Sequence, residues 1–240
     1  MLRSEAVLRA LILVLALPAS ALAQDRVIGL LRLPEVFGNA PCAPFEPRVI
    51  TLHAEPGGAR VASIQVDQNW SFAPHGGCEG LQVSVHRGDA RAELPTREYD
   101  YEAPAAVVVE QRGLWFRIRL DGGASAWAEV PLADRFLSFE SLLEEFVGVT
   151  FIAEGGGGSL SAAPVGTVGS RPGVRVSAGQ PVRVIETRRL AERLWLHVEV
   201  MNHSICNAAA AGPPEVVAEG WLPAHIASGE PAVWFASRGC

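Results

Sequence analysis

The segment Leu114–Leu120 reads LWFRIRL, with an apolar side chain at every second position. Because successive side chains of a β-strand point to opposite faces, this alternation predicts a strand with one buried face. The opposite face carries Trp115, Arg117 and Arg119. A turn sequence, DGG, separates this strand from a second apolar segment, Ala126–Val130, which reads AWAEV. The two segments together predict an antiparallel β-hairpin.

Similar short apolar segments recur on both sides of this hairpin, separated by turns rich in glycine, proline and aspartate. Segments of this kind are typical of strands and predict a mainly β protein. We expect its other strands at residues 48–54, 60–66, 81–86, 106–110, 181–187, 193–200, 216–222 and 232–235.

One short helix is expected near the middle of the chain. Within Leu137–Phe146, the apolar residues Phe139, Leu142, Leu143 and Phe146 follow the i, i+3, i+4, i+7 pattern of an amphipathic helix. We interpret this segment as a packing helix that closes the first domain, after its barrel.

Four consecutive glycines, Gly155–Gly158, interrupt the strand pattern. A glycine run has no backbone preference and contributes no side chain to a core, so it is typical of a linker. We therefore expect a linker at 154–159 between a first domain at 24–153 and a second domain at 160–240.

Three sequence patterns occur once in each half, in the same order. The pattern LHAEPG at 52–57 is matched by LSAAPV at 160–165, LWFRI at 114–118 by LWLHV at 194–198, and SAWAEVP at 125–131 by EGWLP at 219–223. The spacing between them differs because each half contains an insertion that carries a cysteine. The halves are predicted to be two copies of one fold.

These repeated patterns resemble the bacterial Src-homology-3-like domain, over residues 48–131 and 160–235. That resemblance implies two small, strongly bent five-stranded β-barrels, here with insertions and with one short helix after the first. Members of the family are exported by many bacteria, commonly occur in tandem, and often belong to proteins that contact the cell wall. The chain departs from the family pattern in its long insertions and in its cysteines.

The first 23 residues read MLRSEAVLRALILVLALPASALA, with arginines ahead of a short apolar core and small residues at the end. This arrangement predicts a secretory signal peptide at 1–23 and a periplasmic or secreted product, with an uncut signal anchor as the alternative. No later run of about 18 apolar residues occurs, so we expect no membrane span after cleavage.

The four cysteines, Cys42, Cys78, Cys206 and Cys240, all follow the predicted signal peptide. An even number of cysteines in an exported chain predicts disulfides. Three connectivities are open, and we favour Cys42–Cys78 with Cys206–Cys240 because each pair then stays within one domain. A disulfide that closes a loop of about 35 residues stabilises a fold by roughly 3 to 4 kcal/mol.

A ligand-binding face is one hypothesis for the hairpin. Trp115, Arg117, Arg119 and Trp127 are the candidate ligand-binding residues, in a groove that the acidic residues Asp100, Glu102 and Glu129 would also line. The alternative is structural: Trp115 and Trp127, like Trp195 and Trp221 in the second copy, would pack across neighbouring strands. The acidic stretch between Gly88 and Pro104 is expected to be a solvated loop.

The chain shows no nucleophile elbow, zinc-binding helix or phosphate-binding loop, so we expect neither catalysis nor a cofactor. Its net charge is −6, and all 20 basic residues are arginine, a balance that argues against a nucleic-acid ligand. We expect an exported, non-catalytic binding or scaffolding module for a protein or cell-envelope component. The alternatives are a purely structural role and an exported enzyme or metal protein that uses His197, His203, Cys206 and His225, where His203 and Cys206 have ligand spacing.

Overall fold

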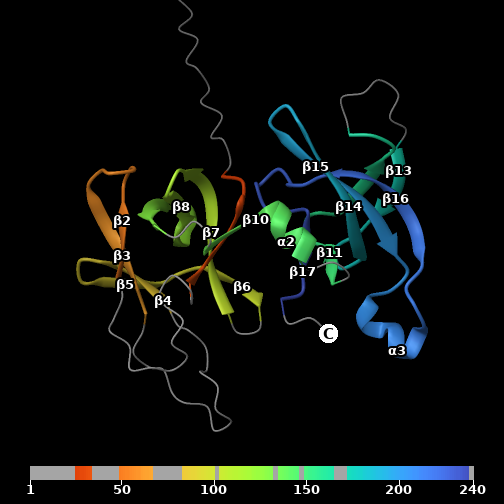
Figure 1. The fold of residues 1–240 in the computed structure, drawn as a ribbon, viewed down its shortest axis with the longest axis horizontal. Coiled ribbons are helices and arrows are strands. Elements are labelled where there is room, and N and C mark those ends of the chain that lie inside the picture. Colours follow the sequence, from red (N-terminus) through yellow and green to blue (C-terminus); the bar gives the residue numbers. More distant parts are fainter. Residues whose placement is uncertain are drawn as a thin grey trace, which may run out of the picture.

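The computed structural model describes residues 25–33, 49–66, 83–100, 103–131, 135–145, 149–164 and 172–237. Two β-sheets lie side by side, with the helix α2 between them (Figure 1). The predicted mainly β fold with a short helix after the first half is confirmed. The predicted signal peptide, Cys42, Cys78, Glu102 and Cys240 lie outside the described residues.

In the described part of the chain, the first sheet has ten strands. Nine of them follow the order β10-β1-β7-β8-β9-β2-β3-β4-β5, and β6 pairs with β7. Their bounds are β1 Gly29–Arg32, β2 Val49–His53, β3 Arg60–Val66, β4 Val83–Arg87, β5 Ala90–Glu93, β6 Thr96–Asp100, β7 Ala103–Arg112, β8 Trp115–Arg119, β9 Ser125–Glu129 and β10 Phe136–Ser138. A short 3-10 helix, η1 at Asp121–Gly123, joins β8 to β9.

The second sheet contains seven strands within the described ranges, in the order β13-β12-β16-β15-β14-β11-β17. These strands are β11 Thr150–Ile152, β12 Gly158–Ser161, β13 Pro172–Val176, β14 Pro181–Leu190, β15 Arg193–Met201, β16 Val216–Pro223 and β17 Val233–Phe235. Helix α2 at Phe139–Glu145 precedes this sheet, and η3 Ile205–Asn207 with α3 Ala208–Ala211 lies between β15 and β16.

The two sheets share one strand plan. Read from its other end, the second sheet runs β17-β11-β14-β15-β16-β12-β13, which matches β10-β1-β7-β8-β9-β2-β3 strand for strand. The cross-strand register also matches, because Trp127 lies opposite Arg117 in the first sheet and Trp221 lies opposite His197 in the second. The duplication that the sequence patterns predict is therefore present in the topology.

The copies differ in their insertions, β4 to β6 in the first and η3 with α3 in the second, and in the length of one hairpin. In the first copy β7 turns into β8 directly after Arg112, which pairs with Trp115. In the second copy, Arg188 pairs with Trp195, but the hairpin continues for two more pairs before it turns. Each long strand carries its irregularity at the same place, between Val108 and Glu110 or between Val184 and Glu186.

The glycine run is not a linker between the sheets. Strand β11 precedes it and β12 begins at Gly158, and both strands belong to the second sheet. The amide of Gly156 donates to the carbonyl of Ala153 at 2.9 Å, and a Cβ on Gly156 would overlap the carbonyl of Ala232. Gly156 is needed for a close backbone approach, and the halves divide at α2 instead of at residues 154–159.

Each of the predicted strands is present, and the alternation in β8 buries Phe116, Ile118 and Leu120. Leu114 is the exception, because it lies in the turn and is 42% exposed. The acidic stretch predicted as a loop instead contains β5 and β6, whose residues are exposed or half-buried.

Two apolar cores stabilise the molecule, and one of them spans both halves. The core of the first half includes Leu31, Phe116 and Ile118. The other joins β1 and β7 to α2 and to the whole second sheet, with Leu30, Val107, Phe139, Leu142, Ile152, Val182 and Trp234 among its buried residues. Strands β1 and β7 are therefore buried on both faces, which explains the continuous apolar run at 105–109.

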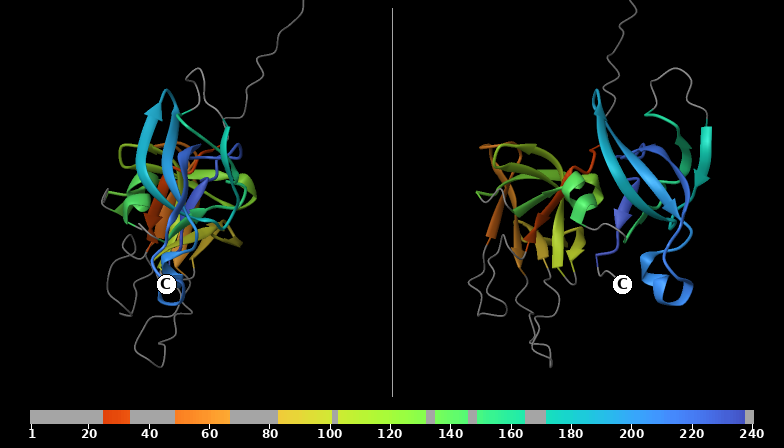
Figure 2. Two further views of the ribbon diagram at one scale, coloured as in Figure 1. Left: turned by 90° about the vertical axis from the view of Figure 1, so that its right-hand side faces the viewer. Right: turned by 45° about the vertical axis from the view of Figure 1, so that its right-hand side comes forward.

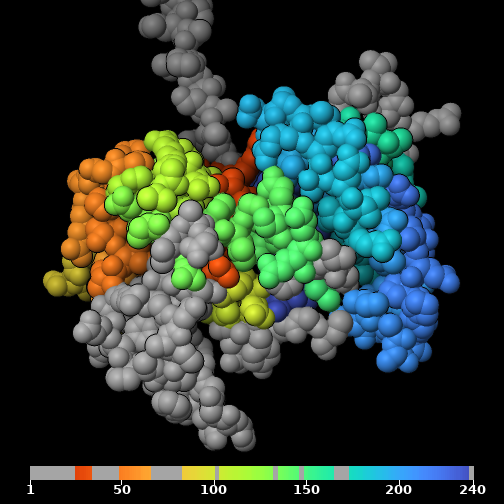
Figure 3. All heavy atoms as spheres, viewed as in Figure 1, coloured from red at the N-terminus to blue at the C-terminus, as the bar shows by residue number. Residues whose placement is uncertain are grey.

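The rotated view places α2 between the two sheets (Figure 2), and the space-filling view shows the atoms around α2 against both halves on the face that it draws (Figure 3). The shared core means that the second sheet packs directly on the first. Within the described ranges, the helices are too short or too polar to cross a membrane.

Candidate binding groove between the two halves

The segment Asp25–Ile28, which we call the strap, runs between the halves and bonds to both. The amide of Val27 donates to the carbonyl of Gly229 at 3.0 Å, and the amide of Ile28 donates to the carbonyl of Val108 at 2.9 Å. The carbonyl of Val27 accepts from Nε2 of His225 at 2.6 Å. The strap thus links the first strand of the chain to the loop before β17.

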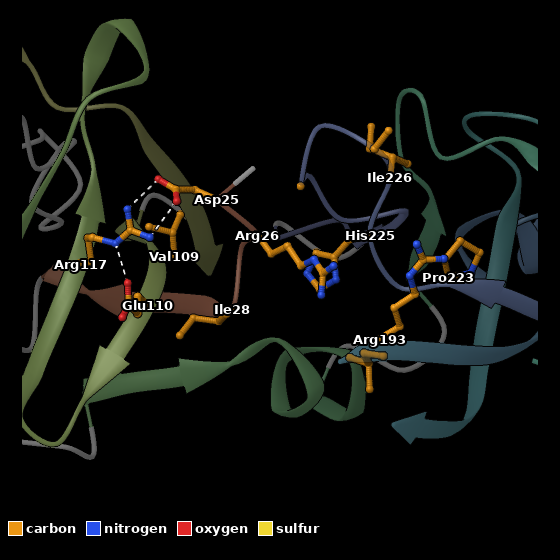
Figure 4. Close-up of a pocket in the computed structure, with 13 residues that line it drawn as sticks. Asp25, Arg26, Ile28, Val109, Glu110, Arg117, Arg193, Pro223, His225 and Ile226 are labelled. Carbon is orange, nitrogen blue, oxygen red and sulfur yellow. Dashed lines mark hydrogen bonds and ion pairs between the residues drawn. The ribbon is translucent and has the colours of Figure 1, made fainter. Parts of the chain in front are cut away.

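Arg117 holds the strap to the first sheet (Figure 4). Its Nη1 and Nη2 donate to the two carboxylate oxygens of Asp25 at 2.9 and 2.7 Å, a bidentate geometry that arginine forms and lysine cannot. Its Nε lies 3.0 Å from Oε2 of Glu110. One guanidinium is therefore shared by two carboxylates.

Arg97 and Arg119 connect the first sheet to Glu230 of the second half. Nη2 of Arg97 donates to Oε2 of Glu230 at 2.6 Å, and Arg119 donates to the other carboxylate oxygen and to the carbonyl of Asp25. Arg97 also lies over the ring of Trp234, 4.5 Å from its centroid. Burial lowers the pKa of the Arg97 guanidinium, with neighbouring Arg119 acting in the same direction and Glu230 opposing both.

His225 is the titratable residue nearest the middle of this contact. A carbonyl can only accept, so the bond to Val27 places the ring proton on Nε2. Burial lowers the pKa of His225, and the nearby Arg26 lowers it further, while the hydrogen bond to Val27 and the carboxylate of Glu140 raise it. The ring of Phe139 lies 5.3 Å away, between centroids.

A groove of about 810 Å³ opens beside the strap, with walls from both halves (Figure 4). This volume is in the range of small-ligand sites. Its apolar wall comprises Ile28, Val109, Leu194, Pro223, Ile226 and Ala227. Its charged residues are Asp25, Glu110, Arg117, Arg26 and Arg193.

The two remaining arginines of the groove are not neutralised. Arg26 donates from Nη1 to the carbonyl of Glu192 at 2.6 Å, which carries no formal charge. In the part of the chain that the structure describes, no carboxylate forms an ion pair with Arg26 or Arg193. Both side chains are exposed.

The predicted ligand-binding residues divide into two groups. Arg117 and Arg119 form ion pairs in the contact between the halves. Of these two residues, Arg117 lines the groove and Arg119 does not. Trp127 is 2% exposed and Arg112 covers its ring at 4.6 Å, so Trp127 is a packing residue. Trp115 packs edge-on against His53, with centroids 5.2 Å apart.

The same packing arrangement recurs in the second copy. Arg188 covers Trp221 at 4.9 Å, as Arg112 covers Trp127. Each arginine pairs with the glutamate two residues before it on its own strand, Glu110 at 2.7 Å or Glu186 at 2.6 Å. Trp195 and Trp221 are 4% and 5% exposed. The conserved plan of the two copies thus favours the structural interpretation of these tryptophans.

The four proposed metal or enzyme residues do not converge. His197 pairs with Glu219 at 3.0 Å and stacks on Trp221, His203 bonds to the carbonyl of Ser204, and His225 bonds to the strap. Cys206 is not a free thiol, which removes it as a thiolate ligand. Among the described residues, no group of three or more His, Cys, Asp and Glu side chains has the spacing of a metal site.

The predicted acidic wall is also dispersed, since Asp100 ends β6 whereas Glu129 lies opposite Trp115 at the end of β9. The cysteine pairing remains a prediction because three of the cysteines lie outside the described residues.

Sequence reasoning did not identify Asp25, Arg26 or Arg193 as site residues. Asp25 and Arg26 lie directly after the predicted cleavage position, in a segment with no strand pattern. Their placement depends on Gly229 and His225, about 200 residues later, and no local signal encodes such a contact.

Comparison with protein-family models, curated proteins and solved structures gives no match to this chain.

Proposed function

We propose that this protein is an exported, non-catalytic binding module in which two related β-domains form one ligand groove. The observation that carries the proposal is the groove itself, because both copies and the strap contribute its walls. A scaffold with two independent domains would not need such a shared surface. The duplicated strand order supports a relationship to tandem Src-homology-3-like domains, and the N-terminal sequence supports a periplasmic or secreted location.

The state of the two groove carboxylates favours binding over proton transfer. Asp25 and Glu110 are both ion-paired to Arg117. A general base needs a free position within hydrogen-bond reach of its substrate. Arginine donors and an apolar wall instead suit orientation of a bound ligand.

Site-specific crosslinking tests this function. A photoreactive benzophenone side chain replaces Ala227, an exposed residue of the groove wall. The control carries the same side chain at Val174, a 55% exposed residue of the edge strand β13 that does not line the groove. We expect one defined envelope component to crosslink at 227, in a manner competed by excess unlabelled protein, and not at 174. Equal labelling at both positions, or none at 227, would reject the groove as the binding surface.

A further inference from the structure

The two unneutralised arginines identify the chemistry of the ligand. Arg26 comes from the strap and Arg193 begins β15, so the two guanidiniums approach the groove from different elements (Figure 4). No ion pair to either is present in the described part of the chain, whereas Arg97, Arg117 and Arg119 all have carboxylate partners. Guanidinium groups that have no carboxylate partner and lie beside an apolar wall are typical recognition groups for planar anions.

The balance of charge in the groove limits the anion. The walls carry three guanidiniums, Arg26, Arg117 and Arg193, against two carboxylates, Asp25 and Glu110. The groove is therefore net positive, and Glu110 also pairs with Arg112 outside the lining. A planar carboxylate matches the fork of a guanidinium and brings less negative charge beside Asp25 and Glu110 than a phosphate dianion does.

The apolar residues of the groove indicate which groups of the ligand lie beside its carboxylate. Ile28, Val109, Leu194 and Ile226 line the groove, with Leu194 and Val109 almost fully buried beneath it. Burial of ligand apolar surface on this wall stabilises binding. A carboxylate flanked by aliphatic side chains would satisfy both parts of the site.

We propose that the groove binds a short peptide segment of a partner protein, through one carboxylate held between Arg26 and Arg193 and aliphatic side chains packed on Ile28 and Ile226. The inference rests on the proposed binding function and names its ligand class. The carboxylate belongs either to a glutamate or aspartate side chain or to a free chain terminus, and the chemistry of recognition is the same in both cases.

Selection from capped peptide libraries tests the proposal on the protein that begins at Gln24. One library has a fixed central glutamate between randomised aliphatic residues, and its matched library has glutamine there. A third keeps glutamine but has a free carboxyl terminus, which separates the two sources of carboxylate. We expect binders from the first or third library and none from the second, with affinities that fall as salt rises.

Arginine variants locate the contact. Arg193→Gln should weaken the selected peptide about tenfold, and Arg26→Gln with Arg193→Gln about a hundredfold, as expected for two charge-assisted contacts. The matched control is Arg175→Gln in β13, an exposed arginine that does not line the groove, and it should leave affinity unchanged. Thermal unfolding of each variant checks that the groove is intact.

Three results would overturn the carboxylate assignment: equal binding of glutamate and glutamine peptides, no binder in any library, or affinity unaffected by Arg193→Gln. Crosslinking at position 227 distinguishes this failure from failure of the binding function. A partner captured at 227 without a preference for carboxylates would retain the function and reject only the ligand class.

Discussion

Arg117 and Asp25 are joined by two hydrogen bonds although 92 residues separate them in the chain. Their side chains are 24% and 33% exposed, so the pair is partly shielded from water. It fixes the strap to β8, and the strap in turn bonds to Gly229 and His225. The relative position of the halves therefore depends on a residue close to the predicted mature N-terminus.

Removal of this pair should destabilise the docked arrangement. Arg117→Ala leaves Asp25 without its cation, while Glu110 keeps only its pair with Arg112, and we expect a loss of about 2 kcal/mol in the free energy of unfolding. Arg117→Lys keeps the charge but not the bidentate geometry, so it should recover only part of the loss. Urea unfolding measures both variants. Equal stability of Arg117→Ala and the parent would contradict a stabilising role for the Arg117–Asp25 pair.

The glycine run supplies a matched pair of substitutions. Gly156→Ala places a methyl group against the backbone of Ala232 and should destabilise the protein by about 1 to 3 kcal/mol, as overpacking does. Gly158→Ala meets no atom within 4 Å, so it should change stability by about 0.5 kcal/mol or less. Thermal unfolding compares the two. If a flexible linker occupied 154–159, the two substitutions would have the same small effect.

Protonation of His225 should weaken the fold. Burial lowers the folded-state pKa of His225 below its ordinary value near 6.5, so the unfolded chain binds the proton more readily. The stability contribution is then complete above pH 6.5 and is lost as the pH falls from there toward the folded-state value. The steepest loss from one such group is about 1.4 kcal/mol per pH unit.

The variant His225→Gln tests this dependence, because glutamine retains an N–H donor for Val27 but does not titrate. Urea unfolding between pH 7.5 and pH 5 should give a flatter profile for His225→Gln than for the parent. His203→Gln, outside the contact between the halves, serves as the control and should keep the parent profile. Parallel profiles for parent and His225→Gln would assign the acid sensitivity to other groups.

The duplicated arginine and tryptophan pairs should contribute independently. Arg112 is 56% and Arg188 49% exposed at the side chain, so each cation–π contact with Trp127 or Trp221 is worth roughly 0.5 to 1 kcal/mol. Arg112→Gln and Arg188→Gln should each lower the free energy of unfolding by that amount. Because the pairs lie in different sheets, the double variant should show the sum. A marked departure from additivity would indicate that the sheets are coupled through these pairs.

Local patterns in the sequence were sufficient to predict the strands and the helix within each copy. Alternation in LWFRIRL predicts which side of β8 is buried, and the 3.6-residue period predicts α2, because both depend on near neighbours. The repeated tryptophan patterns predict the duplication for the same reason. In these elements, the spacing of the apolar residues along the chain places them on the face that the fold buries.

Contacts between distant segments were not predictable in this way. Strand β1 was missed because its four residues GLLR show no alternation, and its two faces serve two different cores. Arg117 and Arg119 were correctly placed on one face, but the sequence does not reveal that Asp25 and Glu230 occupy that face. The groove is defined by the same long-range contacts, so its other residues were missed with them.

The bond between the strap and His225 spans 198 residues, and this separation bears on how the protein folds. Closing so long a loop has a large entropic barrier, so docking of the halves should be the late and slow step of folding. Until β17 has been synthesised, Leu30 and Val107 have no second sheet to cover them. A newly synthesised chain would therefore present this apolar surface for a time, and its yield would depend on how quickly the C-terminal strand arrives or on a chaperone that shields the surface meanwhile.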